Sequence, residues 1–238
     1  MLALAQHYAG RFRVRRIAAA EVCASDAWHA DTALLAFPGG ADLPYAKLLN
    51  GAGNASISRY VSGGGALLGV CAGAYYACAR VAWEVRAASE VSGVRELALF
   101  AGTARGSLHA LAEPYSLEHL QCATVTKLSA DGTSLDLHAL YWGGPEFVPD
   151  EHARYTPLLR YVMPGDRTAL AAVALDVGRG RVVLTGVHAE ITGEQFPIEV
   201  SRFGEDSFDW GMRVSAELTK LDAQRRDTLA LTLNALGV

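Results

Sequence analysis

The chain of 238 residues carries 21 Lys and Arg residues against 25 Asp and Glu residues, a formal net charge of −4. Hydrophobic residues make up 51% of the sequence and charged residues 19%, which is typical of a globular protein and excludes an intrinsically disordered chain. The acidic balance argues against binding to a nucleic-acid backbone. Every apolar run is shorter than the roughly 20 residues needed to span a bilayer. We therefore expect neither nucleic-acid nor membrane partners.

The cysteines and the N-terminus indicate the cellular setting. The N-terminal residues lack the basic segment of a secretory signal. The cysteines show no paired spacing, so neither a zinc site nor a disulfide framework is expected. The four cysteines are Cys23, Cys71, Cys78 and Cys122. We expect a cytoplasmic protein with reduced thiols and without a cofactor or metal.

The first half of the chain is predicted to alternate between strands and helices. Thr32–Phe37 and Ala66–Val70 are continuous apolar runs, which are typical of parallel strands buried on both faces. Phe12–Ile17 alternates loosely and is predicted as a further strand, and helical spacing predicts helices at Ala55–Val61 and Ala74–Val81. This order favours an α/β fold with a mainly parallel central sheet flanked by helices.

The second half is predicted to add antiparallel hairpins to that sheet, because its short apolar segments are separated by turn signals such as Asp131-Gly132 and Gly178-Arg179-Gly180. From Val214 to Leu236, apolar residues recur at helical spacing and predict a long helix. Neither a linker nor a repeat interrupts the chain, so residues 1–238 are predicted to form a single domain. The predicted strands are Ala123–Leu128, Leu137–Trp142, Leu158–Met163, Ala169–Asp176 and Arg181–Val187.

A cysteine between two glycines is the most informative motif. In Gly69-Val70-Cys71-Ala72-Gly73 it follows an apolar strand and precedes a helix, which is the arrangement of a nucleophile elbow. The helix N-terminus favours a thiolate, and the glycines avoid collisions between a Cβ atom and neighbouring backbone. The same pattern also fits a buried, inert cysteine whose glycines serve only close packing.

Two further segments supply the remaining groups of an acyl-transfer site. A predicted strand ends at His188-Ala189-Glu190, where the imidazole can serve a thiolate and the carboxylate can orient the imidazole. Gly39 and Gly40 follow another strand and leave backbone N–H groups free, so with Ala72 they are the candidate oxyanion hole. A surface histidine and an ordinary turn are the alternative interpretations.

These segments together resemble the class I glutamine amidotransferase-like superfamily, and within it the domain found at the N-terminus of eukaryotic biotin–protein ligases and as stand-alone bacterial proteins. The resemblance implies a flavodoxin-like sheet and a catalytic triad of Cys71, His188 and Glu190. It spans nearly the whole chain and is carried by Phe37–Tyr45, Leu49–Asn54, Gly69–Tyr76, Gly93–Leu97, Tyr141–Gly144 and Gly186–Glu190.

The chain departs from the superfamily pattern in two places. Members usually open with a strand before the first helix, and here that first strand is expected to be missing. Ala189 stands where proline is common, although both flanking side chains are kept. No biotin ligase catalytic domain is recognisable, because Gly178-Arg179-Gly180-Arg181 is interpreted as a hairpin turn.

The function that these residues favour is a cysteine-dependent amidohydrolase or amidotransferase-like activity on an amide or related acyl group of a small molecule. Polar and aromatic residues near the predicted mouth, namely Asp42, Tyr45, Asn54 and Tyr75, are the candidate substrate-binding residues. Two alternatives stay open: a non-catalytic ligand-binding or regulatory module, and a cysteine-based redox or stress sensor. A partner enzyme or a homodimer is compatible with the sequence.

Overall fold

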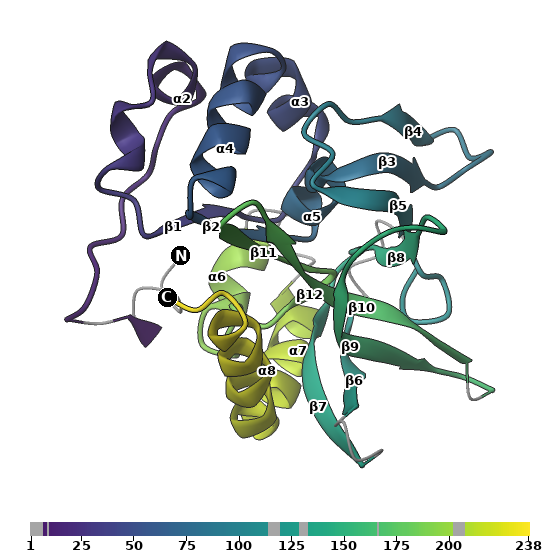
Figure 1. Ribbon diagram of the computed structural model, residues 1–238. Coiled ribbons are helices and arrows are strands. Elements are labelled where there is room, and N and C mark those ends of the chain that lie inside the picture. The colour runs from purple at the N-terminus through teal and green to yellow at the C-terminus, as the bar shows by residue number, and fades with distance from the viewer. Residues whose placement is uncertain (1–6, 9, 114–119, 129–132, 166, 202–207) are drawn as a thin grey trace.

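The computed structural model describes residues 7–8, 10–113, 120–128, 133–165, 167–201 and 208–238. Within these residues the largest feature is a curled eight-stranded sheet in the order β1-β2-β11-β10-β9-β6-β7-β12 (Figure 1). Its strands are β1 (Leu34–Phe37), β2 (Ala66–Val70), β6 (Gln121–Leu128), β7 (Ser134–Tyr141), β9 (Thr156–Met163), β10 (Arg167–Val177), β11 (Gly180–Thr185) and β12 (Val187–His188).

The sheet is mixed, so the mainly parallel, flavodoxin-like sheet that the sequence predicted is not confirmed. Among the described strands of this sheet, only the pairings of β2 with β1 and with β11 are parallel. The other neighbours run antiparallel. A tight turn joins β10 to β11, with Val177 opposite Gly180, and strands joined in this way must run antiparallel. The predicted hairpin between β10 and β11 is therefore present.

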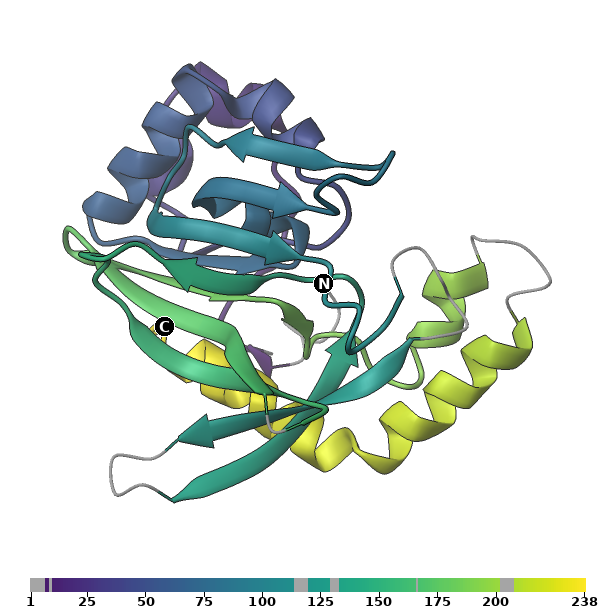
Figure 2. The same ribbon diagram turned by 90° about the vertical axis from the view of Figure 1, so that its right-hand side faces the viewer.

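A smaller sheet in the order β4-β3-β5-β8 lies beside the large one (Figures 1 and 2). In it, β3 runs parallel to β5 and antiparallel to β4. Its strands are β3 (Cys78–Trp83), β4 (Val91–Val94), β5 (Phe100–Gly106) and β8 (Glu146–Pro149).

Helices cover both faces of the large sheet near β2 (Figure 1). All five residues of β2 are buried, as its apolar sequence predicted. Leu67 belongs to a core cluster with Ile57 of α4, whereas Leu68 belongs to a second cluster with Leu229 of α8. The helices are α2 (Ala19–Ala24), α3 (Leu43–Leu49), α4 (Ala52–Ser62), α5 (Ala72–Ala77), α6 (Phe196–Val200), α7 (Phe208–Lys220) and α8 (Asp222–Asn234), with a 3-10 turn at Ala27–His29.

Three predicted elements differ from the structure. The helix predicted over Ala74–Val81 ends at Ala77, because the chain from Cys78 pairs with β4 and β5. The predicted helix from Val214 to Leu236 is divided at Leu221 into α7 and α8. The two helices pack in different core clusters, because Leu218 of α7 belongs to one cluster and Leu229 of α8 to another. Phe12–Ile17 is irregular rather than a strand.

Two predictions fall outside the described residues. The absence of a first strand concerns the N-terminal residues 1–6, and the turn at Asp131-Gly132 lies within 129–132.

Candidate functional site

The carboxyl ends of three neighbouring strands bring the candidate residues together. Phe37 at the end of β1 lies opposite Gly69 of β2, and Val70 at the end of β2 lies opposite Thr185 at the end of β11. The chain leaves these strands at the Gly39-Gly40 turn, at Cys71 and at the segment leading to His188. Three stretches distant in sequence therefore meet at one edge of the sheet.

Cys71 has a strained backbone at the elbow between β2 and α5. It caps the N-terminus of α5 with φ of 50° and ψ of −105°, a conformation that non-glycine residues rarely adopt. The flanking glycines are required by close contact. A Cβ atom at Gly69 would lie 2.8 Å from the Gly73 carbonyl oxygen, and one at Gly73 would lie 2.2 Å from the Phe37 carbonyl oxygen. The collisions predicted from the sequence are thus confirmed.

Gly39 shows how closely the imidazole and the thiol approach each other. A Cβ atom at Gly39 would lie 2.5 Å from Cε1 of His188, 3.3 Å from its Nε2 and 3.4 Å from Cβ of Cys71. The interaction with Cys71 is also one of the causes that raise the pKa of His188. The two side chains therefore face the same small volume beside Gly39, and any larger residue at that position would fill it.

Glu190 completes the arrangement on the other side of the imidazole. Its Oε1 atom lies 2.8 Å from Nδ1 of His188, which leaves Nε2 for the thiol. Burial lowers the pKa of His188, but the charge of Glu190, its hydrogen bond to the ring and the interaction with Cys71 outweigh burial and raise this pKa to about 10. Burial raises the pKa of Glu190, but the charge of His188 and the hydrogen bonds to the carboxylate outweigh burial. The pKa of Glu190 is therefore below its ordinary value.

The thiol is nearly enclosed. Cys71 and His188 are each 6% exposed, so little of either side chain reaches solvent. The Cys71 Sγ atom lies 3.6 Å from the carbonyl oxygen of Trp142, as a hydrogen-bond donor to that oxygen. The Trp142 ring lies 6.4 Å from the imidazole of His188, measured between ring centroids. Trp142 is a site residue that the sequence analysis did not single out, although it lies in the quoted segment Tyr141–Gly144.

The three predicted oxyanion-hole residues differ in their surroundings. Gly39 lies beside Cys71 and His188, as described above, whereas Gly40 is exposed and has φ of +129°. Ala72 is the first residue of α5, so its N–H belongs to the first helical turn, whose donors lack intrahelical acceptors. Their role in binding an oxyanion stays a prediction.

Two of the predicted substrate-binding residues are engaged inside the protein. Asp42 forms a buried ion pair with Arg95, with Nε of Arg95 2.7 Å from Oδ2. Asn54 is 3% exposed, and its Nδ2 atom donates to Glu96 at 2.7 Å. The Tyr76 hydroxyl donates to Oδ1 of Asn54. These contacts link the start of α3 and Asn54 of α4 to Arg95 and Glu96, which follow β4, and to Tyr76 of α5.

The other two are tyrosines that lie within electrostatic range of the thiol. The Tyr45 hydroxyl donates to the Pro38 carbonyl oxygen at 3.0 Å, and the Tyr75 hydroxyl donates to that of Gly143 at 3.1 Å. Burial, followed by the Cys71 charge, raises the pKa of both tyrosines. Tyr45 is half-buried and Tyr75 is buried. Substrate binding by the four residues remains a prediction.

An arginine of α8 supports the turn that carries the histidine and the glutamate. Arg225 is 4% exposed, and its Nη1 atom donates to the Ala189 carbonyl oxygen at 2.6 Å. Its Nη2 atom lies 2.7 Å from the Asp222 carboxylate. Sequence reasoning missed Arg225 because it is 36 residues from Ala189 and no local motif marks it.

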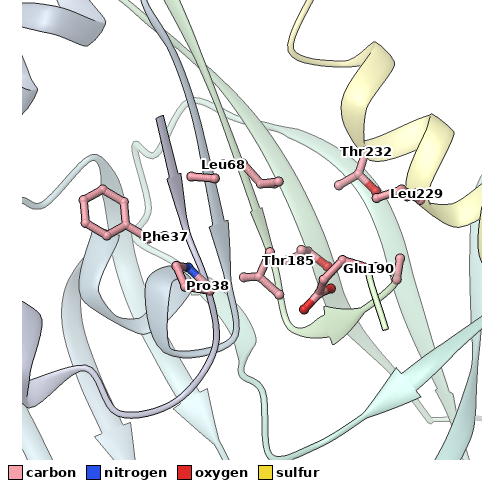
Figure 3. Close-up of a pocket in the computed structure, with 10 residues that line it drawn as sticks. Phe37, Pro38, Leu68, Thr185, Glu190, Leu229 and Thr232 are labelled. Carbon is pink, nitrogen blue, oxygen red and sulfur yellow. The ribbon is translucent and has the colours of Figure 1, made fainter. Parts of the chain in front are cut away.

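A largely apolar pocket opens between the sheet and α8 (Figure 3). Leu68 and Thr185 line it from β2 and β11, and Leu229 and Thr232 line it from α8. Glu190 also lines this pocket, but Cys71 and His188 do not. The pocket therefore borders the Glu190 side of the candidate triad and not the Cys71 thiol.

Two further features bear on chemistry outside the candidate triad, namely the state of the cysteines and the arrangement of metal-ligating side chains. All four cysteines are free. Cys78, which the sequence placed on a helix, begins β3 and is fully buried, and its burial raises the pKa of its thiol. Among the described residues, no group of three or more His, Cys, Asp or Glu side chains is placed to hold a metal ion. In the same part of the chain, no helix has the length and apolar character needed to cross a membrane.

Comparison with known proteins gives one family and several weaker similarities. A family model described as "Biotin-protein ligase, N terminal" matches residues 1–238. An uncharacterized protein of Chlamydia muridarum is 38% identical over 175 residues, which cover 70% of this chain and 64% of that protein. A biotin–protein ligase of Schizosaccharomyces pombe is 31% identical over 185 residues, which cover 77% of this chain and 29% of the ligase. The chain thus matches less than two thirds of the length of either relative.

Similarity to solved structures is weak. The structure of PurLQS from Thermotoga maritima is 16% identical with a TM-score of 0.44, over 78% of this chain and 79% of that chain. A similarity at this level does not establish a shared fold.

Proposed function

The chain belongs to the family of biotin–protein ligase N-terminal domains, and within this family we propose that it is a cysteine-dependent amidohydrolase or amidotransferase-like protein of the class I glutamine amidotransferase-like superfamily. Its substrate is an amide or related acyl group of a small molecule. The observation that carries the proposal is the meeting of Cys71, His188 and Glu190 at the carboxyl ends of β1, β2 and β11.

The first step begins with the thiol proton of Cys71 already transferred to Nε2 of His188, where the raised pKa of the imidazole keeps it, and the thiolate attacks the carbonyl carbon of the amide. Glu190 stabilises the imidazolium through its 2.8 Å contact with Nδ1, which is consistent with the raised pKa of His188. The C–N bond then breaks, His188 returns the proton to the leaving amine, and an acyl thioester remains on Cys71.

In the second step, water hydrolyses the thioester. His188 takes a proton from the water, the hydroxyl oxygen bonds to the acyl carbon, and the C–S bond breaks to release a carboxylic acid and the Cys71 thiol. Backbone N–H groups at Gly39, Gly40 and Ala72 stabilise the oxyanion that forms in each step. Gly39 supports this assignment because it borders both Cys71 and His188.

The proposal extends to the setting of the reaction. Glutamine is the usual amide of the superfamily, and an amidotransferase passes the released ammonia to a synthetase, so a partner enzyme or a homodimer is part of this proposal. A cytoplasmic setting suits it, because the catalytic thiol must stay reduced.

Two measurements on the full chain test the proposed function. The first is the rate at which iodoacetamide labels each cysteine near neutral pH, resolved by mass spectrometry. We expect Cys71 to react at least roughly tenfold faster than Cys23, the half-buried internal comparison, because a thiolate is the reactive form. The second is a screen of amides and esters with the wild type and with Cys71→Ser, in which we expect the variant to lose all turnover.

The other outcomes identify the alternatives. Turnover that survives in Cys71→Ser removes Cys71 from the mechanism. Equal, slow labelling of all cysteines without turnover means a non-catalytic binding or regulatory module. A stable sulfenic or sulfinic acid at Cys71 after treatment with hydrogen peroxide, again without turnover, means a redox sensor.

A further inference from the structure

Three buried tyrosine hydroxyls bind three consecutive backbone carbonyls next to Cys71. The bonds run from Tyr75 to Gly143, from Tyr141 to Gly144 and from Tyr161 to Pro145, with oxygen–oxygen distances of 3.1, 3.0 and 3.0 Å. We name these three tyrosines the tyrosine clamp. They come from three different elements, since Tyr75 lies in α5, Tyr141 ends β7 and Tyr161 lies in β9.

The clamp is buried and its hydroxyls stay protonated. Tyr75 is 5% exposed, and Tyr141 and Tyr161 are fully buried. Burial is the main cause that raises the pKa of each hydroxyl, and the Cys71 charge raises it further. A buried hydroxyl without a partner is costly, so each of these groups is held to its carbonyl acceptor.

Glycines provide the space that the clamp occupies. A Cβ atom at Gly106 would lie 1.8 Å from the Tyr75 hydroxyl oxygen, and one at Gly186 would lie 2.1 Å from that of Tyr161. A Cβ atom at Gly144 would lie 1.8 Å from the carbonyl oxygen of Gly186. We call residues 142–145, which include the three bound carbonyls, the clamped segment. Its backbone is therefore in direct contact with that of Gly186, two residues before His188.

The clamped segment touches both partners of the thiol–imidazole pair. At one end, the Trp142 carbonyl oxygen lies 3.6 Å from Sγ of Cys71. At the other, Gly144 packs on Gly186, two residues before His188. In addition, His188 lies opposite Leu140 in the pairing of β12 with β7. A shift of this segment would move the histidine and the cysteine relative to each other.

We propose that the tyrosine clamp positions His188 against Cys71 by fixing the backbone of residues 142–145. Its members act through that backbone and are positioning residues rather than catalytic ones. The inference rests on the proposed function in one respect: it takes the pair of Cys71 and His188 to be the reactive one.

Tyr161→Phe in the full chain is the sharpest test, because it removes one hydroxyl and keeps the buried ring. The matched control is Tyr60→Phe. Tyr60 is also buried, and the one proton of its hydroxyl lies between two carbonyl acceptors, those of Thr32 at 3.2 Å and Ala66 at 3.1 Å. Ala66 begins β2, so this contact lies at the end of the strand away from Cys71. Tyr141→Phe is the second clamp variant.

Two readouts follow the position of His188. One is the imidazole pKa, measured by NMR and assigned with His188→Gln. The other is the rate of Cys71 alkylation by iodoacetamide near neutral pH. In both clamp variants we expect the His188 pKa to fall by about one unit and the alkylation rate to fall roughly tenfold. In Tyr60→Phe we expect both to match the wild type.

The inference is overturned if His188 titrates in Tyr161→Phe and Tyr141→Phe as it does in the wild type, or if Tyr60→Phe shifts it equally. If one clamp variant does not fold, Tyr75→Phe replaces it with the same readouts. The proposed function fails on a different result, namely slow wild-type labelling of Cys71 with no turnover. A shifted His188 titration in the clamp variants would still support the clamp in that case.

Discussion

Cys71 and His188 each have an unfavourable feature that their neighbours compensate. For Cys71 it is a strained backbone, and for His188 it is the burial of a ring that can carry a charge. Cys71 takes φ of 50° at the start of α5, and its neighbours Gly69 and Gly73 permit the tight turn. His188 is buried, yet its pKa is raised, because Glu190 supplies a negative charge that outweighs the cost of burying an imidazolium. The site therefore holds a proton on the imidazole near neutral pH.

This raised pKa makes stability depend on pH. Because the folded pKa of His188 is about 10 against 6.5 for a free histidine, the protein binds this proton more tightly when folded. The stabilisation is complete below pH 6.5 and is lost as the pH rises to about 10. We expect the free energy of unfolding in urea to fall by about 2 kcal/mol between pH 7.5 and 9.5.

His188→Gln is the comparison that isolates this group from other titrating residues. The variant lacks the proton-binding imidazole, so its unfolding free energy should fall less over the same pH range. Equal slopes for the wild type and the variant would contradict the raised pKa.

At the scale of elements, the elbow depends on the close approach of α5 to the end of β1. Gly73 lies in α5, and the Phe37 carbonyl oxygen belongs to the last residue of β1. Only a residue without a Cβ atom allows this contact, since the Cβ would lie 2.2 Å from that oxygen. The spacing of glycines in the sequence is thus a packing requirement between two elements as well as a property of the turn.

Gly73→Ala should therefore destabilise the fold. We expect the free energy of unfolding to fall by about 3 kcal/mol, because neither backbone segment can move without disturbing the sheet. Gly165→Ala is a suitable control: its Cβ would meet nothing within 4 Å, but its φ of +73° carries a backbone cost of about 1–2 kcal/mol. Urea denaturation of both variants measures the difference, and equal losses would contradict a clash at Gly73.

At the scale of the whole molecule, the site is assembled from parts that lie far apart in the chain. His188 ends β12 and Glu190 lies in the turn that follows, and α8 reaches that turn through Arg225 and the Ala189 carbonyl oxygen. The clamped segment 142–145 approaches the same site from the end of β7. The helical C-terminal part of the chain is therefore part of the support for the candidate triad.

Arg225→Met tests that support. Without the guanidinium, the buried Ala189 carbonyl loses its donor. We therefore expect the free energy of unfolding to fall by about 2–3 kcal/mol and the rate of Cys71 alkylation to fall. Arg226→Met is the matched control, because Arg226 also pairs with Asp222, at 3.4 Å, but is 67% exposed. Urea denaturation and iodoacetamide labelling are the measurements. Similar behaviour of the two variants would mean that α8 does not support the site.

The sequence by itself determined the local features of this protein. The apolar runs predicted β1 and β2, and turn signals predicted the hairpin between β10 and β11, because burial and turn chemistry depend on neighbouring residues. The Gly-x-Cys-x-Gly spacing predicted the elbow at Cys71. These features need no knowledge of which strands pair.

Only the tertiary structure decided how those parts combine. Strand direction in the sheet follows from pairing between distant segments, which is why a mixed sheet replaces the mainly parallel one. The chain from Cys78 to Trp83 forms a strand rather than continuing the helix because β4 and β5 pair with it. Tyr161, Trp142 and Arg225 take their places at the site through contacts across long sequence separations, and no local pattern encodes such contacts.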